Sequence, residues 1–387
     1  MAVIPTKVTT STTICVAIDA PASRSRKVSF GGCLVWWVAA LVLLTSRTIA
    51  GAADADQPGS DLLPAPRPVV RFERDPSGDG FRLGRTTWLA GDATVVGLVP
   101  EHGAARAELD DISLLLRYEP TPRLSLFSET RLENTVSLEE GRGLRAGSGE
   151  LSIERLYAEI LLTPHLELRV GKVLTPFGLW NVIRRAPLSW TVERPIITEH
   201  AFPQHVTGLS LHFQETWRGW SFDATGYGPA QDELAFRGSD ERGLIVGGRT
   251  AVGHTAGSAF VTLALDAATF EEPLTRRWTQ SSGADAEVDV RGHQITGEFA
   301  YEQGGAIAGA RSYGLYVQDA FPLIANLYGV VRFEQFQPRI GSSTAAGLLG
   351  VSWRPARSII VKVDYQFMTR PVGDVTPGLL AAVSLFF

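Results

Sequence analysis

The 387-residue sequence has few of the residues on which several classes of protein depend. Its only cysteines are Cys15 and Cys33, which excludes a disulfide scaffold and a cysteine-rich metal site. Its one long apolar run, 33–45, is shorter than the ~20 residues of a membrane-spanning helix, so a helical membrane bundle is excluded. No basic block accompanies the net charge of −5, which argues against a nucleic acid partner.

Motifs of the common enzyme and metal-binding classes are also absent. The sequence has no His-Glu-x-x-His, Gly-x-Ser-x-Gly or P-loop motif, and its histidines lack the spacing of metal ligands. Ser210 and His212 could share a strand face, as in a barrel-embedded phospholipase, but the His-Asp-Ser-Asn-Gly run of such enzymes is missing. We therefore expect no catalytic residue, no cofactor and no metal ion.

The first 52 residues have the layout of a secretory signal peptide. Basic residues at 24–27 precede the apolar stretch 33–44, and Ala50 and Ala52 follow it as an Ala-x-Ala type cleavage site. We predict removal of residues 1–52, which leaves a cysteine-free chain suited to an oxidising compartment of a Gram-negative bacterium. The alternative for this segment is a buried core helix. Residues 53–80, rich in Asp, Pro and Gly, are predicted to form a flexible periplasmic leader.

Beyond the leader, apolar and polar residues alternate almost without interruption. In 359–367, for example, Ile359, Val361 and Val363 alternate with Lys362 and Asp364. This period predicts β-strands with one apolar and one polar face. Such strands fit either a soluble β-sandwich or a transmembrane antiparallel β-barrel.

The lengths of the connections favour the barrel. Short turns at 119–122, 163–165, 215–217 and 354–357 alternate with longer connections at 137–149, 174–204, 229–241 and 268–282, as in bacterial barrels. An even strand count requires a split of 283–302 at Arg291-Gly292. The fold class predicted for 81–387 is therefore an all-β transmembrane barrel of about 16 strands. Its last strand ends in Phe387, which resembles the assembly signal of outer-membrane barrels.

The segment from Glu154 to Gly178 resembles the region before the constriction loop of phosphate-selective-type bacterial porins. In that family a hairpin ends in Val-Gly-x-x-x-Thr-Pro-Phe-Gly, and here Val170-Gly171 precedes Thr175-Pro-Phe-Gly178. Residues 288–291 and 331–334 are similar to the last third of the family. The resemblance implies an outer-membrane porin, a passive diffusion channel for small hydrophilic solutes or ions. It also implies anions as candidate solutes and a homotrimer as the assembly.

The connection 174–204 follows the fifth predicted strand, where such porins fold a loop into the lumen. The hypothesis is that it constricts the pore and that its arginines lie at the narrowest point. The alternative is an exposed loop with solvated charges. The charged residues in question are Arg184, Arg185, Glu193, Arg194 and Glu199.

The polar faces of the predicted strands place further charges of both signs in the lumen. They set charge limits for solutes or, in the alternative interpretation, only fill a polar interior with salt bridges. These residues are Arg117, Arg131, Arg155, Glu159, Arg169, Arg332, Glu334, Lys362 and Asp364. We expect a porin of the bacterial outer membrane whose partners are lipid and small hydrophilic solutes. The alternative function is a non-conducting structural or adhesive barrel, or a soluble β-rich surface protein.

Overall fold

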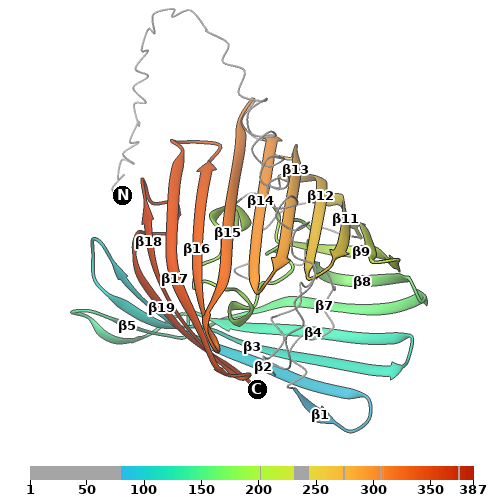
Figure 1. Cartoon of the computed structure of the whole chain (residues 1–387), viewed down its shortest axis with the longest axis horizontal. Coiled ribbons are helices and arrows are strands. Elements are labelled where there is room, and N and C mark those ends of the chain that lie inside the picture. The colour runs from blue at the N-terminus through green and yellow to red at the C-terminus, as the bar shows by residue number, and fades with distance from the viewer. Residues whose placement is uncertain are drawn as a thin grey trace, which may run out of the picture. The chain divides into compact units, whose positions relative to one another are not determined.

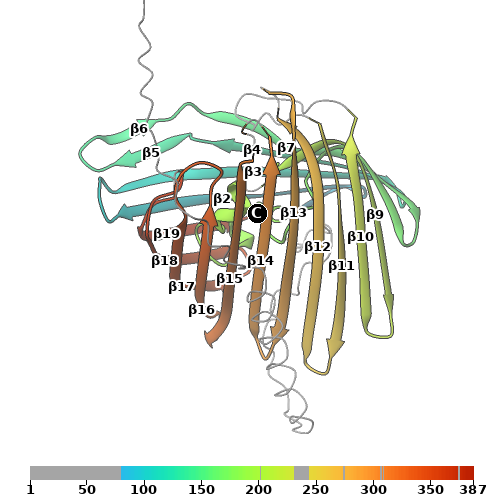
Figure 2. The ribbon, with the colours of Figure 1, turned by 90° about the horizontal axis from the view of Figure 1, so that it is seen from above.

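The computed structural model describes residues 80–387, apart from 201, 231–243, 273–274, 306, 308 and 374. The predicted signal peptide and nearly all of the predicted leader therefore lie outside the described residues. Sixteen strands form one closed antiparallel barrel, because β19 (Gly378–Phe386) pairs with β2 (Thr87–Pro100) along its whole length. Figures 1 and 2 show this continuous wall of strands. No helix in the described part of the chain is long and apolar enough to span a membrane.

The other strands follow one another around the barrel in chain order. Those of the wall are β3 (Arg106–Thr121), β4 (Leu124–Glu133), β7 (Glu150–Thr163), β8 (Leu166–Leu174), β9 (His205–Trp217), β10 (Trp220–Pro229), β11 (Ile245–Ala256), β12 (Ala259–Glu272), β13 (Arg277–Val290), β14 (His293–Gly304), β15 (Arg311–Ile324), β16 (Leu327–Gln337), β17 (Thr344–Ala356) and β18 (Ile359–Met368). Outside this ring, β1 (Phe81–Leu83) pairs with β2, and β5 (Val136–Glu139) and β6 (Gly143–Ala146) form a hairpin.

The two faces of the wall differ as the period-two pattern predicts. On β18, Lys362 and Asp364 are buried inside the barrel, whereas the exposed fractions of Val363 and Tyr365 are 39% and 45%. The same exposed apolar face continues around the barrel. It includes Leu114 and Leu116 on β3, Leu209 and Leu211 on β9, Leu263 and Leu265 on β12, and Leu349 and Val351 on β17.

The strand order and all sixteen predicted strands are confirmed, but one predicted connection is wrong. The stretch 268–282 is mostly strand, since β12 runs to Glu272 and β13 begins at Arg277. Its many charged residues are typical of a loop, yet two of them pair within the β12–β13 hairpin, where Arg276 lies 3.1 Å from Glu271. The predicted split at Arg291-Gly292 is correct. Both residues have positive φ (51° and 84°), the backbone of a tight two-residue hairpin turn.

The segment between β8 and β9, residues 175–204, runs inside the wall instead of over its rim. It contains a short 3-10 helix, η1 (Ala186–Leu188), and one turn of α-helix, α2 (Ile196–His200). Both figures draw it within the ring of strands. We refer to residues 175–204 as the inner segment.

Candidate functional site: the inner segment and the lumen

The inner segment begins with a sharp turn that brings it against Glu298 on β14. Gly178 has φ +68°, and a Cβ at this position would overlap the carboxylate of Glu298 on β14. The next amide, Leu179 N–H, donates to Glu298 Oε2 at 3.3 Å. The Thr-Pro-Phe-Gly run therefore ends in glycine because a side chain there would collide with a strand of the wall.

Side chains of β16 and β18 hold the backbone of the inner segment. Lys362 Nζ donates to the carbonyl oxygens of Ala186 (2.6 Å) and Thr191 (3.1 Å). Arg332 Nη1 donates to Thr191 Oγ1 at 2.7 Å and to the carbonyl oxygen of Glu193 at 2.9 Å. Asp364 Oδ2 also accepts the Val192 N–H at 2.5 Å. Three predicted luminal charges of these strands, Lys362, Arg332 and Asp364, therefore contact the inner segment.

The fourth predicted charge of this wall acts in the same way. Glu334 accepts Arg332 Nε at 2.6 Å through one oxygen and the Ile196 N–H at 2.6 Å through the other. A buried backbone N–H or C=O without a partner costs about 1–3 kcal/mol. Wall side chains of both signs thus stabilise an irregular chain path inside the barrel.

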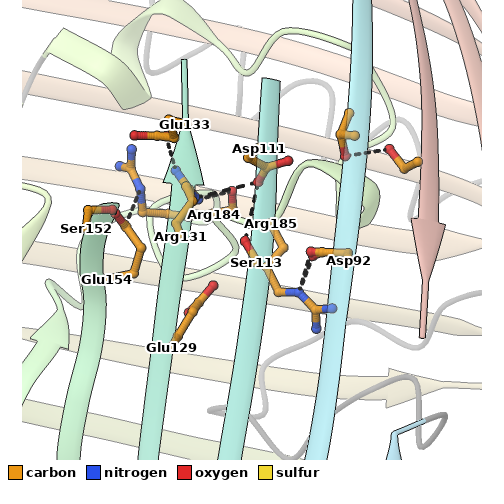
Figure 3. Close-up of polar contacts among 12 residues, drawn as sticks. Asp92, Asp111, Ser113, Glu129, Arg131, Glu133, Ser152, Glu154, Arg184 and Arg185 are labelled. Atoms are coloured by element: carbon orange, nitrogen blue, oxygen red, sulfur yellow. Dashed lines mark hydrogen bonds and ion pairs between the residues drawn. The ribbon is translucent and has the colours of Figure 1, made fainter. Parts of the chain in front are cut away.

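Two arginines of the inner segment are buried against β2 and β7, as Figure 3 shows. Arg185 Nε lies 2.9 Å from Asp92 Oδ1 on β2, and the exposed fractions of the two residues are 5% and 0%. Arg184 lies 3.8 Å from Glu154 on β7, and Arg131 donates to its carbonyl oxygen at 3.2 Å. Burial lowers the pKa of the Arg184 guanidinium to about 10, so it stays cationic at neutral pH. Neither arginine faces open solvent.

The remaining three charges of the inner segment are more accessible. Arg194 pairs with Glu199 at 3.2 Å, and their side chains are 19% and 29% exposed. Glu193 is half-buried beside them, and burial raises the pKa of its carboxyl above the ordinary range, partly opposed by Arg194. Of the five predicted residues, Glu193, Arg194 and Glu199 are the ones that solvent in the lumen can reach.

The predicted luminal arginines of β3 to β8 form a row across adjacent strands. Arg117 lies 3.2 Å from Glu159, and Arg169 lies 3.2 Å from the other oxygen of the same carboxylate. Arg155 is paired with Glu129, a buried carboxylate on β4. Arg131 contacts Glu133 at 3.0 Å and Asp111 at 3.6 Å. Each predicted arginine here therefore has a carboxylate beside it.

An apolar cluster inside the barrel was also missed. Phe177, Trp180 and Phe202 of the inner segment are at most 6% exposed and pack against inward-facing residues of the wall. The wall contributes Tyr157 on β7, Tyr227 on β10, Phe270 on β12 and Tyr316 on β15, among others. These wall aromatics alternate with the outward-facing apolar residues of their strands. This placement on the polar face was the only indication in the sequence that they point into the barrel. Burial of this cluster adds a hydrophobic contribution to the hydrogen bonds that hold the inner segment.

Another group of charged residues lies on the inner face of β11 to β14. Arg249 binds Asp266 at 2.9 Å and also pairs with Asp285, and all three are at most 8% exposed. Glu287 and Glu298 lie on the same inner face. Among the described residues, no three His, Cys, Asp or Glu side chains are arranged to hold a metal ion.

Comparison with solved structures places this geometry among known barrels. A loop-deletion form of OmpT, an outer-membrane protein of Vibrio cholerae, matches with a TM-score of 0.55 and 11% identity over 78% of this chain and 99% of that chain. Salmonella typhi OmpF in complex with daunomycin matches with a TM-score of 0.51 and 13% identity over 78% and 97%. The anion-selective porin of Comamonas acidovorans gives 0.51 and 12% over 78% and 98%. The fold is that of the outer-membrane porins.

Sequence comparison adds little to this. No protein-family model matches the chain. An uncharacterized protein of Aquifex aeolicus is 26% identical over 150 residues, which are 39% of this chain and 31% of that protein. The chain thus spans about a third of the length of that relative. The porin likeness therefore rests on the fold, not on sequence.

Proposed function

We propose that the chain is an outer-membrane porin through which small hydrophilic solutes or ions diffuse passively. The observation that carries the proposal is the inner segment, which is held inside the barrel by Lys362, Arg332, Asp364 and Glu334. A segment fixed at this place narrows the lumen and sets a size limit for solutes. The exposed apolar outer face supports contact with lipid instead of water. Export through residues 1–52 and a homotrimeric assembly are parts of the same proposal.

Conduction by the refolded chain in planar bilayers tests this function. We expect stable, stepwise single-channel currents from residues 53–387. A variant in which 182–194 is replaced by a short Gly-Ser link should give a larger unit conductance, because the narrowing of the lumen is lost. As a matched control, a similar replacement of 137–145, which shortens the β5–β6 hairpin, should leave the unit conductance unchanged.

The outcomes separate the two functions that the sequence left open. A folded, β-rich sample without any current would reject the porin and support the non-conducting barrel. A current that is the same in the inner-segment variant and in the wild type would show that the inner segment is not the constriction. Loss of the β signal in circular dichroism identifies a variant that has not folded.

The solute is a separate question. The resemblance to phosphate-selective porins implies anions, which are attracted where basic charge is clustered. In the described part of the lumen, the arginines of β3, β4, β7 and β8 each have a carboxylate within 4 Å. Phosphate selectivity therefore has no support from these strands.

A further inference from the structure

The inner face of β13 and β14 carries carboxylates that the rest of the barrel does not balance. We propose that this acidic wall, Asp285, Glu287, Asp289 and Glu298, makes the pathway prefer cations over anions. The proposal rests on the proposed porin function and names the class of solute that the lumen favours.

The carboxylates of the acidic wall are regularly spaced along β13 and continue onto β14. Asp285, Glu287 and Asp289 alternate along β13 on its inward face, so successive carboxylates are about 6.8 Å apart along the strand. They continue from the middle of the strand toward the tight turn at Arg291-Gly292. Glu298 lies directly opposite Asp285 in the β13–β14 register. Like charges directly opposite each other destabilise a sheet, so folding alone does not favour this arrangement.

Most carboxylates of the acidic wall have no cationic side chain beside them in the part of the chain that the structure describes. Only Asp285 has a cationic partner, Arg249, and it shares that guanidinium with Asp266. Among the residues that the structure describes, Glu287, Asp289 and Glu298 have no ion-pair partner within 4.0 Å. Glu287 accepts only from Gln294 (2.5 Å), and Glu298 accepts from the Leu179 N–H. Elsewhere in the lumen, Asp92, Glu129, Glu154 and Glu334 each face an arginine.

A carboxylate oxygen of the acidic wall has no hydrogen-bond partner among the described residues. Glu298 is 4% exposed, and its Oε1 has no hydrogen-bond partner. Tyr316, 1% exposed, lies directly opposite Glu298 in the β14–β15 register. A buried carboxylate oxygen without a partner is costly unless a donor or a cation approaches it. The inner segment covers this oxygen at Gly178, so Glu298 acts on a permeating ion through its field, which attracts a cation and repels an anion.

These features give the lumen two unlike walls. On the side of β3 to β8 the charges of both signs are paired, and their fields cancel at short range. On β13 and β14 no described cationic side chain is paired with Glu287, Asp289 or Glu298, so their ionised forms give this side of the lumen a net negative field that raises the local concentration of cations. The acidic wall is therefore the part of the lumen that determines selectivity.

The reversal potential in a KCl gradient tests the proposal. We expect the wild type to be more permeable to K⁺ than to Cl⁻. The variant Glu287→Gln/Asp289→Asn/Glu298→Gln should lower the K⁺/Cl⁻ permeability ratio by roughly threefold or more, because three uncancelled charges are removed. The single variant Glu298→Gln should lower it in the same direction and is the fallback where the triple variant does not fold.

A matched control removes three carboxylates from connections outside the lumen: Glu101→Gln/Glu139→Gln/Glu140→Gln. It should leave the permeability ratio within error of the wild type. A conducting wild type that prefers Cl⁻ would overturn the cation preference while the porin function stands. An unchanged ratio in a folded, conducting Glu298 or triple variant would overturn the role of the wall. A folded wild type without current would reject the porin function itself.

Discussion

Lys362 on β18 lies 2.8 Å from the hydroxyl of Ser189 on the inner segment, and the lysine is 1% exposed. With the carbonyl oxygens of Ala186 and Thr191 as its other acceptors, all three hydrogens of the ammonium are directed at the inner segment. Hydrogen bonds of a charged donor each contribute about 1.5–3 kcal/mol. This lysine therefore connects the wall of the barrel to the part of the chain that we propose narrows it.

The first prediction concerns this contact. Lys362→Met keeps the length of the side chain but leaves two carbonyl oxygens and a hydroxyl without a donor. We expect the free energy of unfolding to fall by about 2–4 kcal/mol and the open channel to become noisier, because the inner segment moves more. Denaturant unfolding in detergent and single-channel recording measure the two effects.

Arg117→Met is a suitable control for this variant. It removes a lumen-facing cation whose ion pairs, with Glu119 and Glu159, lie within the wall. Its current noise should match that of the wild type. Equal noise in both variants would show that Lys362 does not hold the inner segment in place.

The second prediction concerns the buried pair of Arg185 and Asp92. Because both side chains are at most 5% exposed, Arg185→Met alone should remove a cationic partner from a buried carboxylate and cost about 3–5 kcal/mol of stability. The double variant Arg185→Met/Asp92→Leu should recover much of this loss. A double-mutant cycle of unfolding free energies measures the coupling, and a coupling near zero would show that the pair is not formed in solution.

The sequence predicted the wall of the barrel better than its interior. Strict alternation, as in 359–367, defines a strand and its two faces, since side chains on a strand alternate with period two. The connection 268–282 was assigned wrongly because Glu271, Glu272 and Arg276 resemble loop residues. In the structure Arg276 pairs with Glu271, and Glu272 accepts from the Thr275 hydroxyl, while the ladder continues as far as the Glu272–Arg277 pair.

The interior depends on contacts that sequence patterns do not contain. The position of 174–204 after the fifth predicted strand indicated a loop inside the lumen. It did not indicate which of the charged residues in that loop are buried. Arg185 finds Asp92, which lies 93 residues earlier in the chain, and Arg332 finds Thr191 from 141 residues away. The absence of a cation beside Glu298 depends on which side chains the neighbouring strands β13 and β15 and the inner segment place around it. Such properties follow only from the closed barrel.

The third prediction is a pH dependence that arises at Glu193. Burial raises the pKa of this carboxyl in the folded state above its unfolded value, so the ionised form is disfavoured on folding. The folded protein therefore gains stability relative to the unfolded chain as the pH falls through the raised folded value, where the carboxyl takes up a proton, and the gain is complete below the unfolded value. The variant Glu193→Gln should be more stable than the wild type at neutral pH, and the difference should shrink on acidification. Unfolding free energies of both proteins at several pH values measure this, and a constant difference would contradict it.

The fourth prediction concerns the outer face of the barrel. Leu265 on β12 is 65% exposed and lies near the middle of its strand. If this face contacts lipid, Leu265→Arg should cost about 2–4 kcal/mol, the penalty for arginine near the centre of a bilayer. Leu144 on β6 is 73% exposed but belongs to the hairpin outside the barrel wall, so Leu144→Arg should be nearly neutral. Unfolding from phospholipid vesicles compares the two variants. Equal, small effects would mean that water covers both positions, and the transmembrane assignment would then be wrong.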